Sequence, residues 1–373
     1  MKIKIKQNIL MENLNYVIRG ISNKNIIPIL SCLKISLKDE GLYLMSTDNE
    51  LAIKTFIDKK DIESIDEIGD FVVSGRYMYD IVKKLPNDIV TIEEVIDSKI
   101  FITTNKYSFS LNCNKVSEFP NLDLEEHKNP IEINKKIFKN IISQTVFATS
   151  NQESRPVLTG LNMKIEDDLL ECTATDSYRL SKKNIKLTAN LEEKVNIIIP
   201  TRNLLELIKI MADDDNNLEM HIFSNKIIFK FDNIIMMSRL INGTYPDTSK
   251  LIPETYSLTM KANLNEFYKA IDGVALLTSE VDKNTIKLES NGNIVTLLST
   301  MSEIGTAKSE IDVEKSNNTE IKIAFSAKYM MDAIKSLDCE NIELLFNGEV
   351  KPIIIKNPDT NDLIQLILPI RTY

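Results

Sequence analysis

The 373-residue sequence has few of the residues that enzymes use at their active sites. It contains no tryptophan, two histidines and ten glycines. It has no glycine-rich loop of the phosphate-binding or dinucleotide-binding type and no Gly-x-Ser-x-Gly elbow. His127 stands in a polar stretch and His221 in a segment that alternates like a strand, so neither is expected to bind a metal or to act as an acid or base. We therefore expect a protein without catalytic residues, metal or cofactor.

Clusters of acidic residues do not change this expectation. Asp167 and Asp168, like residues 213–215, stand in expected turns among many charged neighbours. A two-metal site needs carboxylates that hold both ions about 4 Å apart. Solvated loops are the more economical interpretation of these clusters.

Cysteines and long apolar runs are also scarce. The four cysteines lie far apart with apolar or strand-like neighbours, which predicts reduced structural thiols rather than disulfides or a zinc site. The longest apolar runs, such as residues 363–370, are too short to span a bilayer. Residues 1–7 alternate like a strand and lack the apolar core of a signal peptide. A cytoplasmic protein without a membrane segment is expected. The cysteines are Cys32, Cys113, Cys172 and Cys339.

One amphipathic segment is present three times. Arg76, Arg202 and Lys328 are each 126 positions apart, and apolar residues at helical spacing follow each of them. Every copy has an acid four positions after this cation and a lysine three positions after the acid. The acids are Asp80, Glu206 and Asp332, and the lysines are Lys83, Lys209 and Lys335. A period of this length predicts tandem domains and not a solenoid of short repeats.

Further matches between the first two repeats support this division. Residues 28–33 resemble residues 156–161, and Thr47-Asp48 resembles Thr175-Asp176. Both matches have the same offset of 128 positions. Each repeat is expected to contain a first helix, alternating strands, the repeated helix and closing strands, which is an α+β fold. The first helices are expected at residues 8–19, 134–147 and 263–276, and Asn-Gly at 291–292 predicts a tight turn. The domains are expected at residues 1–125, 126–250 and 251–373, with short connectors that hold them in fixed relation.

The distribution of charge matters more than its sum. A net charge of −9 argues against a protein that binds nucleic acid over its whole surface. The repeated helix has two interpretations. It is a solvated face with ion pairs inside the helix, such as Arg76 with Asp80, or one of three basic faces that contact a DNA backbone weakly and without sequence preference. The first helices would add Lys135, Lys136, Lys139 and Lys269 to such a basic wall.

Several stretches along the whole chain resemble the bacterial sliding clamps, the beta subunits of DNA polymerase III. These stretches are residues 27–30, 117–123, 154–160, 174–180, 242–247 and 368–371. The resemblance implies three tandem copies of a DNA-clamp domain, in which two helices pack on antiparallel sheets. It also implies that two chains form a six-domain ring with the repeated helices on the inside and double-stranded DNA in the hole.

The resemblance also assigns sites. DNA contacts fall on Lys24, Arg76 and Gln152, and Pro156 and Val157 replace a pair of tyrosines. The dimer interface falls on Phe109, Leu111, Leu276 and Leu277. The pocket for partner peptides falls on Leu158, Thr175, Ser177, Tyr178, Arg179, Leu180, Pro246, Lys250, Leu251, Ile367, Leu368, Pro369, Ile370 and Arg371.

This sequence departs from the family at some of these positions. Ser177 and Tyr178 stand where some members have glycine and histidine, Ile370 replaces a methionine, and Thr372-Tyr373 extends the end. Ser108 and Ser309 stand where charged residues of the dimer interface are often found.

The implied function is a processivity factor that holds the catalytic subunit of DNA polymerase III, and other proteins with a clamp-binding motif, on DNA as a homodimer. A separate ATP-dependent clamp loader is expected, because the sequence contains no nucleotide-binding motif. Two other functions are considered. A three-domain peptide-binding adaptor would not encircle DNA, and a polymerase would need clustered metal-binding carboxylates, which the sequence does not show.

Overall fold

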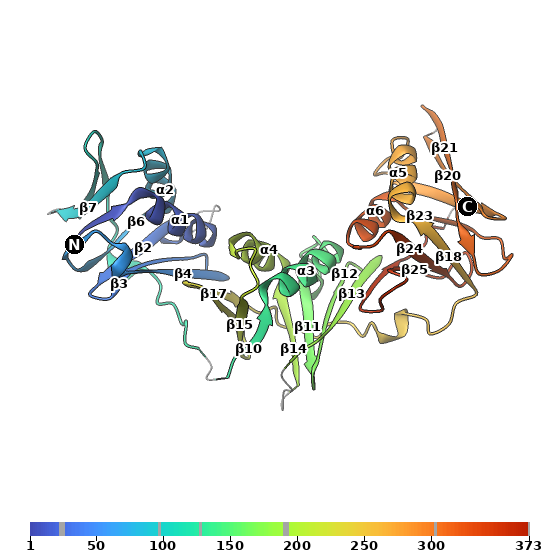
Figure 1. Cartoon of the computed structure of the whole chain (residues 1–373), viewed down its shortest axis with the longest axis horizontal. Coiled ribbons are helices and arrows are strands. Elements are labelled where there is room, and N and C mark those ends of the chain that lie inside the picture. The colour runs from blue at the N-terminus through green and yellow to red at the C-terminus, as the bar shows by residue number, and fades with distance from the viewer. Residues whose placement is uncertain (22–26, 96–97, 127–128, 189–193, 302–303, 372–373) are drawn as a thin grey trace. The chain divides into compact units, whose positions relative to one another are not determined.

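A computed structural model describes the chain except residues 22–26, 96–97, 127–128, 189–193, 302–303 and 372–373 (Figure 1). The chain forms two compact units. Unit 1 consists of Met1–Ile137 and Arg202–Leu240, and unit 2 consists of Phe138–Thr201 and Ile241–Tyr373. The segment predicted as the second domain contributes to both units, and the domain boundaries at 125 and 250 stay a prediction.

Unit 1 contains two antiparallel sheets. Their strand orders are β5-β1-β7-β8-β9 and β10-β15-β16-β17-β4-β3-β2-β6. The strands are β1 (Lys2–Lys6), β2 (Cys32–Lys38), β3 (Gly41–Thr47), β4 (Leu51–Asp58), β5 (Ser64–Glu67), β6 (Gly69–Ser74), β7 (Ile89–Val95), β8 (Lys99–Thr103), β9 (Ser108–Asn112), β10 (Ile131–Asn134), β15 (Asn217–Ile222), β16 (Lys226–Phe231) and β17 (Ile234–Arg239). Pairing of β17 with β4 joins strands of two predicted domains in one sheet.

Unit 2 is also built on two antiparallel sheets. Their orders are β14-β11-β12-β13-β26-β25-β24-β18-β22 and β21-β20-β19-β23. The strands are β11 (Gly160–Glu166), β12 (Leu169–Thr175), β13 (Arg179–Lys186), β14 (Val195–Pro200), β18 (Leu258–Asn263), β19 (Thr285–Asn291), β20 (Ile294–Met301), β21 (Gly305–Asp312), β22 (Glu314–Lys315), β23 (Lys322–Ser326), β24 (Asn341–Phe346), β25 (Ile353–Lys356) and β26 (Leu363–Ile367). Here β13 pairs with β26, so the strands of two predicted domains again share a sheet.

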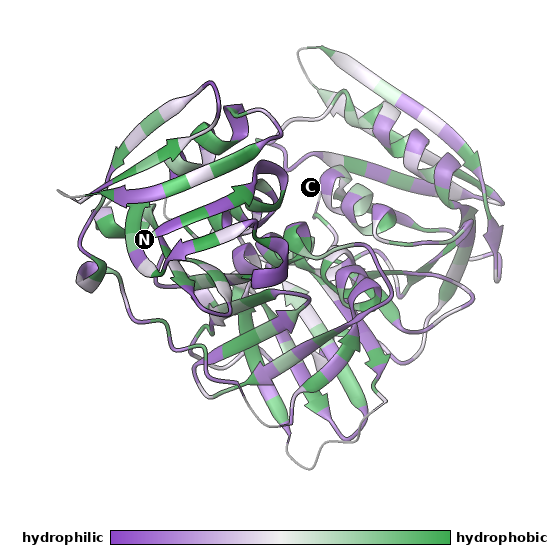
Figure 2. Cartoon of the chain, turned by 60° about the vertical axis from the view of Figure 1, so that its left-hand side comes forward, coloured by the Kyte–Doolittle hydropathy of each residue, from purple (hydrophilic) through white to green (hydrophobic). Residues whose placement is uncertain are grey.

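The alternation of the strands agrees with sheets that have one buried face. In β8, Ile100 and Ile102 are buried, whereas Lys99 and Phe101 are exposed. Figure 2 shows the same change between hydrophobic and hydrophilic colours along many strands. The predicted turn at 291–292 joins β19 to β20, and Gly292 has φ 57°, a conformation that glycine adopts without steric cost.

Six α-helices occur in the described part of the chain: α1 (Gln7–Val17), α2 (Gly75–Lys84), α3 (Lys135–Thr145), α4 (Thr201–Ile210), α5 (Leu264–Ala275) and α6 (Ala327–Lys335). They confirm the three predicted first helices and the three repeated helices. Asn263 caps α5, because its side chain accepts a hydrogen bond from the Glu266 amide at 3.1 Å. Short 3-10 helices occupy Ile18–Gly20, Pro28–Ser31, Lys59–Asp61, Val116–Glu118, Val146–Ala148, Pro156–Thr159 and Ser249–Leu251.

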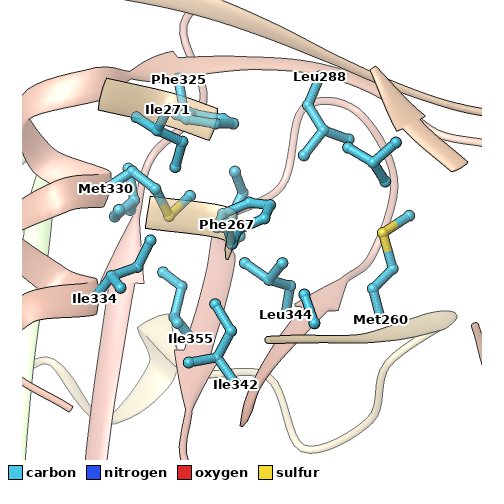
Figure 3. Packing of buried hydrophobic residues seen from close by; sticks show 14 of the residues in the cluster. Met260, Phe267, Ile271, Leu288, Phe325, Met330, Ile334, Ile342, Leu344 and Ile355 are labelled. Atoms are coloured by element: carbon cyan, nitrogen blue, oxygen red, sulfur yellow. The ribbon is translucent and has the colours of Figure 1, made fainter. Parts of the chain in front are cut away.

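The core of the third repeat shows why the helices have their apolar face. Phe267 and Ile271 of α5 and Met330 and Ile334 of α6 are all fully buried (Figure 3). They pack with side chains of the strands, among them Leu344. The opposite faces of the two helices, which point away from this core, carry the polar residues. This packing fixes the direction in which the cations of α6 point.

The cysteines and the helices bear on two further expectations, within the described part of the chain. All four cysteines are free thiols, as predicted, and burial raises the pKa of the Cys113 thiol to about 11. None of the helices has both the length and the apolar character needed to cross a membrane.

Candidate nucleic-acid interface and partner pocket

The repeated helices present their cations in the same way. Arg76, Arg202 and Lys328 are each the second residue of their helix, in α2, α4 and α6. All three are exposed, and the side chains of Arg76 and Arg202 keep 84% and 63% of their surface. The apolar residues of each helix are held in a core, so the cations are fixed on the outward side.

Each repeated helix was expected to have an ion pair between its first cation and the acid four positions later. Among these described residues, this pair is present only in α2. Arg76 lies 3.8 Å from Asp80. Arg202 instead pairs with Asp48 at 2.8 Å, in the turn before β4. This expectation was wrong for α4, because sequence spacing within a helix does not reveal acids that other segments bring close.

The acid of α4 has partners from two elements. Glu206 accepts hydrogen bonds from Lys209 at 2.8 Å and from Arg19 at 3.0 Å, and Arg19 lies just after α1. Burial disfavours the ionised carboxylate, but these two cations outweigh that effect and lower the pKa of Glu206. The acid therefore stays charged and joins α4 to the first repeat within unit 1.

The second lysines of the repeated helices remain exposed. Lys83 lies over the ring of Tyr79 at 5.6 Å, and Lys335 lies over the ring of Tyr268 at 5.1 Å. A hydrogen bond with Tyr268 raises the pKa of Lys335, so this lysine stays protonated at neutral pH. Lys209 is exposed beside Glu206.

The remaining predicted DNA contacts have different outcomes. Gln152 is exposed in the loop after α3, where its amide donates to the Ser150 hydroxyl at 3.0 Å. Lys24 lies outside the described residues. Lys136 and Lys269 are exposed and Lys139 is half-buried.

Lys135 does not belong to a basic wall, and this expectation was wrong. Its side chain is 0% exposed, and its ammonium lies 2.6 Å from Asp232 and 3.1 Å from Asp214. A lysine at the start of a helix is usually a surface residue, whereas two turns of unit 1, at Asp214 and Asp232, close over Lys135. The two carboxylates neutralise the charge of Lys135 within unit 1.

We expect replacement of Lys135 by alanine to destabilise the protein by roughly 2 kcal/mol, because two carboxylates lose their buried partner. Urea unfolding followed by circular dichroism measures this change. Lys136→Ala is the matched control, since Lys136 pairs with Asp215 at the surface, and it should leave the midpoint unchanged. Equal effects of the two substitutions would contradict the assignment.

The centre of the predicted partner pocket is a strand junction in unit 2. Arg179 of β13 is in register with Ile367 of β26, and the Leu368 amide donates to the Tyr178 carbonyl at 2.9 Å. Leu180 and Ile367 are buried, whereas Tyr178 is 59% exposed. Leu368 is exposed as well. The junction thus supports two apolar side chains that face solvent.

Leu158 and Thr175 meet at a residue that the sequence did not assign to the pocket. Leu158 is buried with Ile198 and Tyr245. The Tyr245 hydroxyl accepts a hydrogen bond from the Thr175 amide at 3.0 Å, and burial raises the pKa of Tyr245, which keeps it protonated. Tyr245 lies next to Pro246, in one of the stretches that resemble the family. This position in the sequence could have indicated that Tyr245 belongs to the pocket.

Ser177 occupies a turn whose backbone favours glycine. Its φ is 77°, and Asp176 closes the turn by accepting hydrogen bonds from the amides of Tyr178 and Arg179 at 2.9 and 3.0 Å. The side chain of Ser177 has one long contact, 3.4 Å from Arg155. This geometry explains why glycine suits the position.

We expect Ser177→Gly to stabilise the chain by about 0.5 kcal/mol, because relief of the left-handed conformation exceeds the added freedom of the unfolded chain. Thermal unfolding measures the gain. Ser177→Ala removes the same hydroxyl and keeps the strain, so it should give no gain. A rise with alanine and none with glycine would refute the explanation.

The remaining pocket positions lie on both sides of this junction. Lys250 and Leu251 are exposed. The Ile370 amide donates to the Ala324 carbonyl at 2.7 Å, which places residues 369–371 against β23. Ile370 and Arg371 line a pocket of about 400 Å³, and with Pro369 they line another of about 340 Å³.

The predicted dimer residues lie at the edges of sheets or on the surface. Phe109 and Leu111 are half-buried on β9, the outermost strand of its sheet. Leu276, just after α5, is 82% exposed, and Leu277 is half-buried. Strand β21, to which the sequence assigned no role, is likewise an outermost strand. Unpaired strand edges favour pairing with another chain.

His221 belongs to a group that the sequence did not bring together. One ligand atom each of His221, Glu219 and Glu126 lie within 4.8 Å of one another. The Lys230 ammonium lies 2.6 Å from Glu126 and 3.7 Å from Glu219. Lys230 already supplies a positive charge to both carboxylates, so these residues form an ion network that joins the segment of Glu126 to β15 and β16.

Three repeats of one helix-and-sheet unit, each with an exposed cation at the same helix position, define the class of DNA clamps. Comparison with known families agrees. The N-terminal domain of the DNA polymerase III beta subunit matches residues 1–123, the central domain 132–247 and the C-terminal domain 249–371.

Relatives and solved structures lead to the same family. The beta sliding clamps of Staphylococcus epidermidis and Staphylococcus aureus are each 40% identical over 377 residues, covering 100% of both chains. The solved structure of the sliding clamp from Bacillus subtilis matches with a TM-score of 0.96 at 36% identity. That of the beta chain from Streptococcus pneumoniae matches with a TM-score of 0.96 at 32% identity, and in both cases 100% of both chains is covered. The chain belongs to the DNA polymerase III beta subunit family, the beta sliding clamps. The α+β clamp fold is confirmed, and the chain is an accessory subunit and not an enzyme. An adaptor that does not encircle DNA finds no support among these relatives.

Proposed function

We propose that two copies of this chain close head to tail into a ring around double-stranded DNA and let the DNA polymerase III catalytic subunit travel with it in the cytoplasm. The observation that carries this proposal is the exposed cation at the second position of α2, α4 and α6. The family matches support a division of the chain at about 125 and 250.

The contact with DNA is electrostatic and independent of sequence. Cations that reach phosphates carry no information about the bases, and their effect weakens as salt increases. Acids alternate with the cations on each helix, and the chain has a net charge of −9. The contact is therefore weak, and confinement by the ring, in place of affinity, keeps the protein on DNA.

Ring closure uses the outermost strand β9 with Phe109 and Leu111 on one chain and the region of Leu276 and Leu277 on the other. An exposed leucine next to an unpaired strand edge fits a surface that becomes buried in a dimer. Opening of the ring requires an ATP-dependent clamp loader as a separate partner.

Partner proteins bind at the junction of β13 and β26. Tyr178, Leu368 and Leu251 offer exposed apolar surface, and Lys250 and Arg371 add positive charge at its edges. Such a surface suits a short peptide with apolar anchors. The polymerase catalytic subunit and other clamp-motif proteins compete for it.

A scan of overlapping peptides from the cognate polymerase catalytic subunit tests the pocket by fluorescence anisotropy. For the peptide that binds tightest, Tyr178→Ala should weaken the affinity roughly 30-fold, because truncation of an aromatic anchor typically costs about 2 kcal/mol. Tyr77→Ala is the matched control, since Tyr77 is an equally exposed tyrosine on α2. Unchanged binding by Tyr178→Ala would rule out this pocket.

A further inference from the structure

The side chain of Arg179 is occupied by contacts within unit 2. It is only 10% exposed, although Arg179 is the first residue of β13 and stands beside the exposed Tyr178. Its Nε donates to Asp176 at 3.0 Å, and its Nη1 donates to Asp332 at 2.6 Å. These bonds use two of the five N–H donors of the guanidinium, and a side chain that is 10% exposed offers little surface to an acidic group of a ligand.

Two aromatic rings complete this environment. The guanidinium carbon lies 4.4 Å from the ring centre of Tyr329 and 5.4 Å from that of Phe147. Tyr329 belongs to α6 in the third repeat, and Phe147 follows α3 in the second. Cation–π contacts add to the ion pairs and fix the plane of the guanidinium. Arg179 is thus held from both repeats.

Asp332 differs from the acid at the same position of α2. Asp80 pairs with Arg76 in its own helix, whereas Asp332 pairs with an arginine from another repeat. Glu206 of α4 likewise pairs with an arginine from outside its helix, Arg19. In α4 and α6 the acid of the basic face therefore serves to attach the helix to the preceding repeat.

The backbone around Arg179 carries the apolar side chains of the pocket. The Arg179 carbonyl accepts a hydrogen bond from the Thr175 hydroxyl at 2.6 Å, and the preceding carbonyl, of Tyr178, accepts one from the Leu368 amide. Movement of Arg179 would therefore displace both Tyr178 and Leu368.

We propose that Arg179 is a positioning residue, which acts with Asp332 to hold the β13–β26 junction against α6, and not a direct contact of the partner peptide. This inference rests on the proposed function of the junction as the peptide pocket. Its consequence is that an acid on the DNA-facing helix α6 sets the affinity for partners. Binding of a peptide depends on a surface whose geometry is fixed in advance, because ordering during binding costs affinity.

Asp332→Asn is the informative substitution, since it keeps the size of the side chain and removes its charge. Other links in unit 2 remain, such as Lys183 with Asp362 at 2.6 Å and Gln144 with the Ser336 carbonyl at 3.0 Å, so the variant is expected to fold. Asp80→Asn is the matched control on α2. Asp332→Glu keeps the charge and should recover most of the lost affinity.

The probe is the polymerase peptide that binds the wild-type chain most tightly. We expect Asp332→Asn to weaken its binding 5- to 20-fold, and Arg179→Ala to weaken it by a similar factor with no further loss in the double variant. Asp80→Asn should bind like the wild type. Wild-type affinity for Asp332→Asn together with weak binding by Arg179→Ala would overturn the proposal and make Arg179 a direct contact.

Hydrogen exchange without peptide tests positioning by itself. The amide of Leu368, which bonds to Tyr178, should exchange at least 10-fold faster in Asp332→Asn than in Asp80→Asn. Unchanged exchange would overturn the positioning role. Failure of every peptide to bind the wild type would overturn the proposed function of the pocket, while the exchange rates would still decide whether Arg179 holds the junction.

Discussion

A chain with aspartate in place of Leu276 should be a monomer under conditions in which the wild type is a dimer. Leu276 is 82% exposed, and the proposed ring buries it. Full burial of a leucine contributes about 1.5–3 kcal/mol, and a carboxylate buried without a partner costs several more. The dissociation constant of the dimer should therefore rise at least about 100-fold. Analytical ultracentrifugation over a range of concentrations measures this change.

Val350→Asp provides the control for this prediction. Val350 is an exposed apolar residue of the third repeat outside the predicted dimer contacts, so its substitution should leave the dimer intact. Dimers of equal strength in both variants would place the dimer interface elsewhere.

The second large effect concerns the cations on the repeated helices. Simultaneous replacement of Arg76, Arg202 and Lys328 by alanine removes six positive charges from the proposed dimer. Each lost phosphate contact should reduce the slope of log affinity against log salt by about 0.9, so the slope should fall by up to about five. At low salt, the affinity for linear duplex DNA should fall roughly 100-fold.

A charge-matched variant separates position from net charge. Lys59, Lys106 and Lys351 are exposed lysines outside the repeated helices, and their replacement by alanine changes the net charge by the same amount. Titrations at several salt concentrations should show a nearly wild-type slope for this control. The same loss of slope in both triple variants would mean that DNA responds to overall charge and not to the helix faces.

The parts of the fold that depend on local pattern were predictable from the sequence. The three repeated helices follow from apolar spacing, and the strands of unit 1, such as β4 at Leu51–Asp58, follow from alternation. The sequence also indicated an exposed position for Arg76. These features depend on neighbours a few residues away, which the sequence displays directly.

Contacts between distant segments could not be read in this way. The pairing of β17 with β4, the burial of Lys135 by Asp232, and the pairing of Asp332 with Arg179 all join residues from different repeats or turns. Ion pairs within a helix have a fixed spacing, whereas these pairs depend on how sheets and loops come together. For the same reason Tyr245, which supports Thr175, was not assigned to the pocket.

Retention on circular DNA tests the central claim most directly. The protein is loaded onto a nicked circular duplex with the cognate clamp loader, separated from free protein by gel filtration at high salt, and followed before and after one cut by a restriction enzyme. A ring that holds DNA by confinement should stay on the circle and leave within the time of the assay once the ends are free. Equal loss from circular and linear DNA would contradict the account, because it would show that affinity and not enclosure holds the protein on DNA.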